Sequence, residues 1–478
     1  MEKTIEQEAY NYFYEVLQIP RGSGNEKAIS DHLVAFAEEN HLEHMQDESL
    51  NVVIRKQGSE GRQNEPPVIL QAHMDIVCEK NEEFKHDFLT DPIIPVIDGD
   101  WVRASGTTLG ADNGSGVAYI MAVLAATDIS HPPIEAVITT GEETVCAGAA
   151  AFNAAVLKGK RLLNLDGEKE GNFIVSCAGA TVITVKISVD HETVPETFSA
   201  YKLMLKGLTG GHSGCDIDKG GGNANILMAT LLDRLYNEDI RLFNINNGGK
   251  MNAIPRECSA VISFDENHLE TIKMILAHTE SEFRVHHPFD IDLRLSLEKS
   301  GVSGKAMSNA ALEKLIKTML HMPNGVYSLS SRIEGLVQTS NNLGVITTDE
   351  NTITMTNLLR SSSIAEMEIV IEKFNQLADR PGINVEVFRS FPAWEYMDDS
   401  PLRNTLKAVY REMYGKEPVI TSVHAGVECA LFAQKIPGAD IASIDGPDIV
   451  GMHSPNEKMS IPSFNRTCRF LVRVLEKL

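Results

Sequence analysis

The segment Val68-Ile-Leu-Gln-Ala-His73-Met-Asp75 decides how the N-terminal part of the chain folds. It begins as a short apolar run with the length of a buried β-strand, and a histidine and an aspartate follow where that strand should end. Similar short runs alternate with helical patterns on either side of it. Strands are expected at 52–55, 134–140 and 162–165, and helices at 5–17, 26–40 (capped by Ser23 or Asn25) and 114–126. This alternation predicts an α/β fold around a mostly parallel central sheet.

The middle of the chain has a different pattern. The run Thr181-Val-Ile-Thr-Val-Lys-Ile-Ser-Val189 alternates polar with apolar residues, which is typical of a sheet with one face in water. Between 202 and 297 the expected order is βαββαβ, a ferredoxin-like unit, and a similar order recurs between 312 and 388. We therefore predict an inserted α+β domain of two ferredoxin-like units at 180–391. The α/β domain around it is discontinuous, 1–179 and 392–478, and ends in an amphipathic helix.

The composition narrows the class of protein. The 478 residues predict two to three domains at about 150 residues each. The formal charge, 43 − 66 = −23, disfavours nucleic acid and anionic membrane surfaces as partners. No apolar run is long enough to cross a membrane, and residues 1–10 do not have the pattern of a signal peptide. Seven scattered cysteines fit a reducing compartment. We expect a cytoplasmic protein with no nucleic acid or membrane partner.

Metal-type ligands stand at or near the ends of five short segments. The segments are Val68 to Asp75 with His73, Gly110-Ala-Asp112-Asn-Gly, Ile138-Thr-Thr-Gly-Glu142-Glu143, Leu162-Leu-Asn-Leu-Asp166-Gly and Gly451-Met-His453-Ser-Pro. Each alone is weak, because Asp-Asn-Gly is usually a turn, a glutamate pair is usually solvated and a lone histidine is usually structural. Together they are expected to converge at the carboxyl ends of the strands, where open α/β sheets bind ligands. Carboxylate and imidazole ligands suit zinc, manganese or cobalt.

Other catalytic motifs are absent from the sequence. There is no His-Glu-x-x-His run, no Gly-x-Ser-x-Gly elbow and no Gly-x-x-x-x-Gly-Lys-Ser/Thr loop. The glycines at 210–211 and 220–222 are interpreted as turn residues rather than a phosphate cradle.

These segments resemble the co-catalytic dinuclear zinc metallopeptidase family that includes aminoacylase and carnosinase-type dipeptidases. The inserted domain adds Gly210-Gly-His212-Ser-Gly and Asn252-Ala-Ile-Pro255 to the match. Cys177-Ala-Gly179, Asn252 to Glu257 and His424-Ala-Gly-Val-Glu428-Cys look closest to its aminoacyl-histidine (Xaa-His) dipeptidase branch. The resemblance covers nearly the whole chain, with no departure at a ligand position. It implies a zinc-peptidase-like catalytic domain with the inserted domain as a lid.

The resemblance also implies roles at the metal centre. It implies two divalent metal ions per chain, zinc first, with cobalt and manganese as alternatives. Asp112 would bridge the two ions; His73 and Asp166 would complete one site, and Glu143 and His453 the other. Glu142 would be the general base and Asp75 would accept the free N–H of His73. The peptide bond Asp112–Asn113 would be cis.

In the lid, the resemblance implies residues that contact the substrate. His212 would hydrogen-bond the oxyanion of the tetrahedral intermediate, and Asn252 would contact the substrate backbone. Arg360 would bind the C-terminal carboxylate of a dipeptide, as guanidinium geometry permits, unless it forms a structural ion pair instead. Outside the lid, in the predicted catalytic domain, Glu168 or Glu428 could meet the substrate ammonium group.

The predicted function is metal-dependent hydrolysis of small peptides, namely dipeptides, including Xaa-His and carnosine-like ones. A tripeptidase, an aminoacylase or a carboxypeptidase would share every metal ligand and differ only in its pocket. An inactive peptide-binding protein should have lost a ligand or the base, and none is lost. A purely structural zinc site is a further alternative. Such sites are usually closed by cysteine and histidine, whereas the ligand set here is rich in carboxylates. Because the lid has two units, we expect each chain to complete its own active site; a homodimer is left open.

Overall fold

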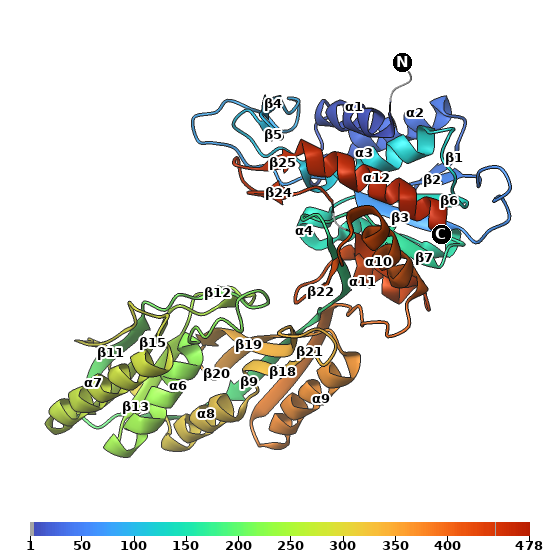
Figure 1. Ribbon diagram of the computed structural model, residues 1–478. Coiled ribbons are helices and arrows are strands. Elements are labelled where there is room, and N and C mark those ends of the chain that lie inside the picture. Colours follow the sequence, from blue (N-terminus) through green and yellow to red (C-terminus); the bar gives the residue numbers. More distant parts are fainter. Residues whose placement is uncertain (1–3, 445) are drawn as a thin grey trace. The chain divides into compact units, whose positions relative to one another are not determined.

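The computed structural model describes residues 4–444 and 446–478, and contacts between residues divide the chain into two compact units (Figure 1). Unit 1 comprises Met1–Ser176, Tyr396–Ser422 and Val427–Leu478, and unit 2 comprises Cys177–Glu395 and Val423–Gly426. The sequence predicts domain boundaries at 179/180 and 391/392. The short second segment of unit 2 is held by its own unit, since the backbone N–H of Ala178 donates to the carbonyl of Val423 at 3.0 Å.

Unit 1 is built on an eight-stranded sheet with the order β1-β2-β6-β3-β7-β23-β8-β22. Its strands are β1 (Glu43–Gln46), β2 (Val52–Lys56), β3 (Val68–His73), β6 (Ile134–Thr139), β7 (Arg161–Asn164), β8 (Asn172–Cys177), β22 (Val419–Val423) and β23 (Asp440–Ile444). Strand β3 is parallel to both β6 and β7, and β7 is parallel to β23. The parallel centre confirms the predicted α/β class. All six residues of β3 are buried, as its apolar sequence requires.

Unit 1 has eight α-helices among the described residues, of which those at 5–17, 27–39, 111–125 and 461–477 correspond to predicted helical segments. The eight helices are α1 (Ile5–Leu17), α2 (Lys27–Glu39), α3 (Ala111–Ala125), α4 (Glu142–Val145), α5 (Ala147–Ala151), α10 (Pro401–Tyr414), α11 (Glu428–Lys435) and α12 (Ile461–Lys477). Helices α1, α3 and α12 meet at the rings of Phe13, Tyr119 and Phe464, with Phe464 4.6 Å from Tyr119 and 5.9 Å from Phe13 between ring centroids. A separate sheet has the order β24-β25-β5-β4 and comprises β4 (Pro95–Asp98), β5 (Trp101–Ala104), β24 (Ile449–Val450) and β25 (Lys458–Ser460).

The predicted cap of α2 is wrong. Glu26 occupies the N-cap position, and no side chain caps the helix there. The Ser23 hydroxyl instead donates a charge-assisted hydrogen bond to Asp75 Oδ2 at 2.7 Å. Asn25 donates its side-chain amide to the carbonyl of Leu89 at 3.4 Å.

Unit 2 contains two large antiparallel sheets besides two short two-stranded ones, and Figure 1 shows its long helices side by side along the large sheets. The first sheet, β13-β15-β11-β16, comprises β11 (Phe198–Lys206), β13 (Arg241–Asn246), β15 (Cys258–Asp265) and β16 (Arg294–Lys299), with α6 (Ala224–Leu235) and α7 (Leu269–His286). The second, β18-β19-β20-β9-β21, comprises β9 (Gly179–Ser188), β18 (Gly325–Leu329), β19 (Val337–Thr348), β20 (Thr352–Ser361) and β21 (Ile383–Phe391), with α8 (Asn309–His321) and α9 (Ile364–Asn375).

Both sheets have the ferredoxin-like strand order, which confirms the prediction of two such units. One point of connectivity was missed. The first strand of the second ferredoxin-like unit is β9. This strand precedes the whole first ferredoxin-like unit in the chain and pairs with β20 and β21. The first ferredoxin-like unit is therefore inserted within the sequence of the second ferredoxin-like unit. The apolar face of β9, Ile183, Val185 and Ile187, is fully buried, and that burial is what selects its distant partners.

Among residues 4–444 and 446–478, no helix combines the length and the apolar character that a membrane-crossing segment needs.

Candidate metal centre

Three neighbouring strands of unit 1 deliver the predicted ligands to one edge of the sheet. His73 is the last residue of β3, Glu142 and Glu143 open helix α4 just after β6, and Asp166 follows β7 by two residues. The parallel register pairs His73 with Thr139 and Gln71 with Asn164, so β3 and β6 end at the same level and β7 ends two residues earlier. The alternation of strand and helix in the sequence is thus sufficient to bring these side chains together.

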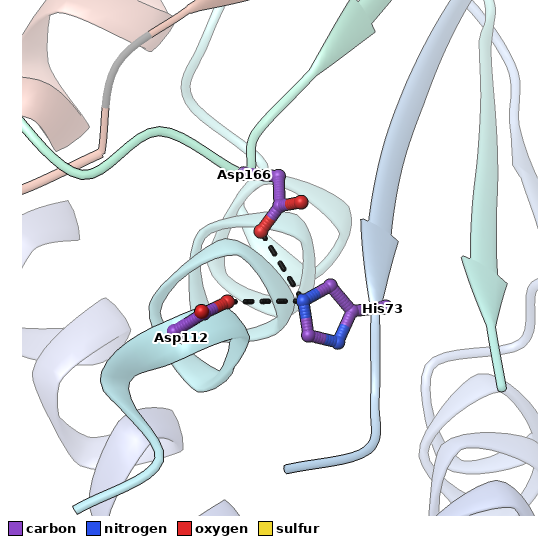
Figure 2. A group of neighbouring side chains, drawn as sticks. All are labelled: His73, Asp112 and Asp166. Carbon is purple, nitrogen blue, oxygen red and sulfur yellow. Dashed lines mark hydrogen bonds and ion pairs between the residues drawn. The ribbon is translucent and has the colours of Figure 1, made fainter. Parts of the chain in front are cut away.

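His73 is the centre of the first group of ligands. Figure 2 shows the carboxylates of Asp112 and Asp166 directed at the same nitrogen of the His73 ring. His73 Nε2 lies 3.0 Å from Asp112 Oδ1 and 3.2 Å from Asp166 Oδ1. Ligand atoms about 2.0–2.1 Å from a tetrahedral zinc ion are themselves separated by about 3.3 Å. The three atoms therefore have the spacing of ligands around one cation.

His453 is the centre of the second group. Its Nε2 lies 3.2 Å from Asp112 Oδ2 and 3.1 Å from Glu143 Oε2. Asp112 thus presents one oxygen to each histidine, the arrangement of a carboxylate that bridges two cations about 3.5–4 Å apart. The ligand atoms of His73, Glu142 and Glu143 also lie within 4.8 Å of one another, so Glu142 borders the same space.

The backbone around Asp112 is held from two sides. The Asp112–Asn113 peptide bond is cis, as the resemblance implied, and Gly110 before it has φ 72°. The Asn113 amide donates to Asp166 Oδ1 and to the carbonyl of Leu165. Glu457 accepts the backbone N–H groups of Leu109, Gly110 and Ala111 at 2.8–3.1 Å. Asp112 and Asp166 are therefore linked to each other and to the loop that carries His453.

Asp75 is buried and connects His73 with the α4 turn. Its Oδ1 lies 3.4 Å from His73 Nδ1 and accepts the backbone N–H of Glu142 at 3.0 Å. Its Oδ2 accepts the N–H of Glu143 at 3.2 Å, in addition to the Ser23 hydroxyl. These bonds lower the pKa of Asp75 to about 2 although burial opposes ionisation. One carboxylate thus orients both the histidine and the backbone of the two glutamates.

Two residues around the centre were not found from the sequence. Arg21 is 1% exposed and donates to the carbonyls of Met74 at 2.9 Å and Gly110 at 2.7 Å. Glu457 is 2% exposed and receives the three N–H groups described above. No local pattern marks Arg21, a single arginine after Pro20. Glu457 lies four residues after His453, and this nearness in the sequence to a predicted ligand was the one available signal.

The electrostatics of the centre favour added positive charge. Burial raises the pKa of Glu142 to about 9, and the carboxylates of Asp166, Glu428 and Asp112 add to the rise. Hydrogen bonds to Asp112 and Glu143 raise the pKa of His453 to about 10. Although burial opposes its protonation, the carboxylates of Asp166 and Asp112 raise the pKa of His73 well above 6.5. The carboxylates around the two imidazoles therefore leave an excess of negative charge that bound cations would neutralise.

The residues fit two divalent cations. Five carboxylates (Asp75, Asp112, Glu142, Glu143 and Asp166) surround two imidazoles, a donor set suited to zinc, manganese or cobalt. Glu143 Oε1 is buried and has no hydrogen-bond partner in the described part of the chain. A buried carboxylate oxygen without a partner is costly, and a cation would satisfy it. Because Asp112 belongs to both histidine groups, the ligands fit a pair of ions rather than a single ion.

Unit 2 brings three of the other predicted residues together. His212 lies on β12 (Gly211–His212), which pairs with β14 (Ala253–Ile254), so the exposed Asn252 lies beside it. Arg360 on β20 is 7% exposed, and its Nη2 lies 3.5 Å from His212 Nε2. In the described residues Arg360 has no carboxylate partner, which is contrary to the alternative of a structural ion pair.

The hydrogen bonds of His212 define its donor atom. The backbone N–H groups of Gly214 and Cys215 both donate to His212 Nδ1 at 3.2 Å, so the ring proton of the neutral imidazole is on Nε2. Burial and the Arg360 guanidinium lower the pKa of His212 and keep it neutral. His424, whose Nε2 lies 2.8 Å from Ser340 Oγ, has its pKa lowered to about 4 by burial, Arg360 and His212. This group offers hydrogen-bond donors and positive charge.

The two candidates for the substrate ammonium group differ in exposure. Glu428 is 1% exposed and accepts two hydrogen bonds inside unit 1, so it cannot meet a substrate. Glu168 is exposed, and its carboxylate has no hydrogen bond or ion pair in the described residues. Desolvation by neighbouring protein atoms, together with the carboxylates of Asp112 and Asp166, raises the pKa of Glu168 to about 7.

Comparisons with known proteins agree with this geometry. The model of peptidase family M20/M25/M40 matches residues 69–477. The cytosol non-specific dipeptidase of Escherichia coli strain K12 is 36% identical over 475 residues, 99% of this chain and 98% of that protein. The crystal structure of aminoacylhistidine dipeptidase from Vibrio alginolyticus has a TM-score of 0.92 and 35% identity, covering 100% of this chain and 98% of that one. Aminopeptidase PepT from Bacillus cereus ATCC 10987, at 16% identity, TM-score 0.63 and 99% and 98% coverage, shares the fold.

Proposed function

The chain belongs to peptidase family M20/M25/M40, and on that premise we propose that it is a dipeptidase that works with two divalent cations, zinc first among them. The observation that carries the proposal is the Asp112 carboxylate, whose two oxygens face His73 and His453 at 3.0 and 3.2 Å. The E. coli relative is named a dipeptidase, and the similar V. alginolyticus structure is an aminoacylhistidine dipeptidase. Dipeptides, among them Xaa-His and carnosine-like ones, are therefore the proposed substrates.

His73, Asp112 and Asp166 would hold one cation, and Asp112, Glu143 and His453 the other. When bound there, the two cations supply Lewis acidity and lower the pKa of a water molecule. Asp75, whose Oδ1 lies 3.4 Å from His73 Nδ1, would keep the ring of His73 in place as the acceptor of its Nδ1 proton, which leaves Nε2 free to act as a ligand.

Glu142 is the proposed general base. Its backbone N–H is held by Asp75, while its carboxylate borders the ligand groups without belonging to either of the two assigned sets. In this position it takes a proton from the attacking water and gives it to the leaving amine. Glu143, the next residue, directs Oε2 at His453 instead. The turn of α4 thus separates base from ligand.

We assign the substrate contacts of unit 2 from the resemblance and from the donors found there. His212 Nε2–H donates to the oxyanion, Asn252 contacts the substrate backbone and Arg360 binds the C-terminal carboxylate. Glu168 meets the ammonium group, since its carboxylate is exposed and has no partner of its own. In this proposal unit 2 is the lid, and the two ferredoxin-like units allow one chain to complete its own site.

The proposed location is the cytosol, as in the name of the E. coli relative. A homodimer is compatible with the proposal but not required by it. Subunit mixing tests this point: Glu142→Ala chains are combined with His212→Ala chains under conditions that allow exchange. No recovery of activity is expected, and recovery would mean that His212 acts across subunits.

A hydrolysis panel tests the function itself. Metal-loaded protein is offered Ala-His, carnosine, two dipeptides without histidine, one tripeptide and one N-acetyl amino acid. Cleavage of dipeptides over the tripeptide and the N-acetyl compound is the expected result. Preferential cleavage of the tripeptide or of the N-acetyl amino acid would assign a tripeptidase or an aminoacylase, and no turnover with any loaded metal would favour a peptide-binding protein.

A further inference from the structure

Three uncharged polar residues lie on the strands directly before the metal centre. Gln71 on β3 precedes His73 by two residues, Thr139 on β6 precedes Glu142 by three, and Asn164 on β7 precedes Asp166 by two. Their exposed fractions are between 0 and 3%. Buried polar side chains in an otherwise apolar sheet must find partners, and these three find them in one another and in Glu428.

Glu428 is the first residue of α11 and is 1% exposed. Its Oε2 accepts a hydrogen bond from Gln71 Nε2 at 2.6 Å and another from Thr139 Oγ1 at 2.8 Å. The Asn164 amide donates to Gln71 Oε1 at 2.5 Å and extends the network to the third strand. One carboxylate oxygen therefore connects the ends of β3, β6 and β7.

The other oxygen of Glu428 is unusual. Glu428 Oε1 is buried and has no hydrogen-bond partner among the described residues. Burial raises the pKa of this carboxyl to about 7, with His73 acting in the opposite direction. Its place at the N-terminus of α11 offsets only part of the cost of burying it. A buried acid in this condition weakens the core compared with an apolar residue of the same volume, so its presence needs a reason other than stability.

We propose that Glu428 is a positioning residue of the metal centre, which acts through Gln71, Thr139 and Asn164 to set the spacing of His73, the Glu142–Glu143 turn and Asp166. The three network residues stand two or three positions before those groups, one on each strand. A shift of one strand end along its axis would change the ligand spacing directly. This inference rests on the proposed function, because it assumes that the ligands hold cations.

The first test removes the hydroxyl through which Thr139 donates to Glu428 Oε2 at 2.8 Å and accepts from Gln71 Nε2 at 3.2 Å, with almost no change in volume. Thr139→Val deletes the hydroxyl that reaches Glu428. Thr140→Val is the matched control, because the hydroxyl of this adjacent residue donates to the carbonyl of Ser49 at 2.8 Å and not to Glu428. Zinc affinity is measured by calorimetry on chelator-treated protein, together with the melting temperature, kcat and KM. We expect Thr139→Val to weaken zinc binding about 10-fold and to lower kcat more than KM changes, whereas Thr140→Val leaves zinc affinity unchanged.

The second test separates position from charge. Glu428→Gln keeps an oxygen that can accept from Gln71 and Thr139 but removes the charge, and Glu428→Leu removes both. Positioning predicts zinc affinity within about threefold of wild type for the glutamine variant and a loss of about 10- to 100-fold for the leucine variant. If the leucine variant does not fold, Thr139→Val and Glu428→Gln still decide the matter.

Each other outcome has a definite meaning. Equal losses of zinc affinity in Glu428→Gln and Glu428→Leu would replace positioning with a charge effect. Lower melting temperatures in Thr139→Val and Thr140→Val alike, with zinc affinity and kcat intact, would reduce the network to ordinary core structure. Wild-type protein that binds no zinc, cobalt or manganese would overturn the proposed function instead, and this inference with it.

Discussion

The metal centre of unit 1 and the cluster of His212, Arg360 and His424 in unit 2 have opposite electrostatic character. At the metal centre, acceptor atoms converge, and the pKa values of His73 and His453 are raised by the carboxylates around them. In the unit 2 cluster, donors converge, and the pKa values of His212 and His424 are lowered by burial and by Arg360. Histidine therefore lies among carboxylates in one region and beside a guanidinium in the other, and we propose a ligand role for the first and a neutral donor role for the second.

This difference indicates what each region lacks. The metal centre lacks positive charge, which two cations would supply. The unit 2 cluster lacks an anion, since Arg360 has no carboxylate partner in the described residues. A dipeptide has an anionic carboxylate at one end and a cationic amine at the other, and the exposed Glu168 beside the metal ligands suits the amine. The experiments below test this contrast, starting with the largest expected effect.

Removal of the cations should abolish activity and leave the fold intact. Dialysis against EDTA removes the cations that balance the charge of the five carboxylates. The apolar cores, such as the contact of Phe13, Tyr119 and Phe464, do not depend on metal. Activity, circular dichroism and metal content by elemental analysis are measured together. Adding zinc back should restore turnover with two ions per chain. Full activity at one ion per chain would contradict the bridging role of Asp112.

Substitutions in the α4 turn should separate base from ligand. Glu142→Ala should lower kcat by about 10²–10⁴-fold with both metals retained, because it removes a proton acceptor and no ligand. Glu143→Ala should lose affinity for the metal near His453, since Glu143 Oε2 lies 3.1 Å from His453 Nε2. Metal content and steady-state kinetics of the two variants are compared. The reverse pattern would show that the roles of the two glutamates are exchanged.

In unit 2, His212→Ala should mainly affect the transition state. Loss of one oxyanion donor typically costs about 10²–10³-fold in kcat, while the metal content should remain that of wild type. His212→Gln, which keeps an N–H donor, should recover part of the loss. An increase in KM with kcat unchanged would mean that His212 binds the substrate ground state instead.

Arg360→Ala should act on substrate binding. Charge-assisted hydrogen bonds contribute about 1.5–3 kcal/mol, so KM should rise by roughly 10- to 100-fold with a smaller change in kcat. Arg360→Lys should be intermediate, because an ammonium group cannot bind a carboxylate in a bidentate way. Dipeptide amides serve as the second measurement. If wild type cleaves them as well as free dipeptides, Arg360 does not bind the C-terminal carboxylate.

The smallest effect concerns stability at acidic pH. The pKa of His424 is about 4 in the folded chain, against a usual value of 6.5, and Arg360 and His212 are the charged or titratable groups that lower it. Between these pH values the unfolded chain binds a proton that the folded chain does not, so stability is lost as pH falls, by up to about 3 kcal/mol.

Thermal unfolding of wild type and His424→Gln between pH 7 and 4 tests this point. The glutamine variant should lose less stability on acidification than wild type. The control is His278→Gln, at a solvent-exposed histidine of α7. Identical pH profiles for wild type and His424→Gln would show that His424 does not contribute to acid sensitivity.

The sequence led us to expect that His73, Glu143 and Asp166 would lie close together, because each follows an apolar strand and parallel strands end at one edge of a sheet. The sequence did not reveal Arg21 or Glu457, and it suggested Glu428 only for the substrate ammonium group, because the contacts of these residues join segments that are far apart in the chain. Glu428 lies 357 residues from Gln71, and no local pattern indicates which strand a buried carboxylate will reach. For the same reason, β9 could not be assigned to its sheet before its partners β20 and β21 were known.

By itself, the sequence determined the α/β class, the two ferredoxin-like units and the metal-type residues, since periodicity and residue chemistry are local properties. The tertiary structure decided that Asp112 faces two histidines, that Asp75 holds both a ligand and the α4 turn, and that Ser23 bonds a carboxylate rather than a helix end. It also distinguished Glu168 from Glu428, because Glu168 is exposed and Glu428 is buried. Burial and hydrogen bonding between distant segments set these outcomes, and they exist only once the chain is folded.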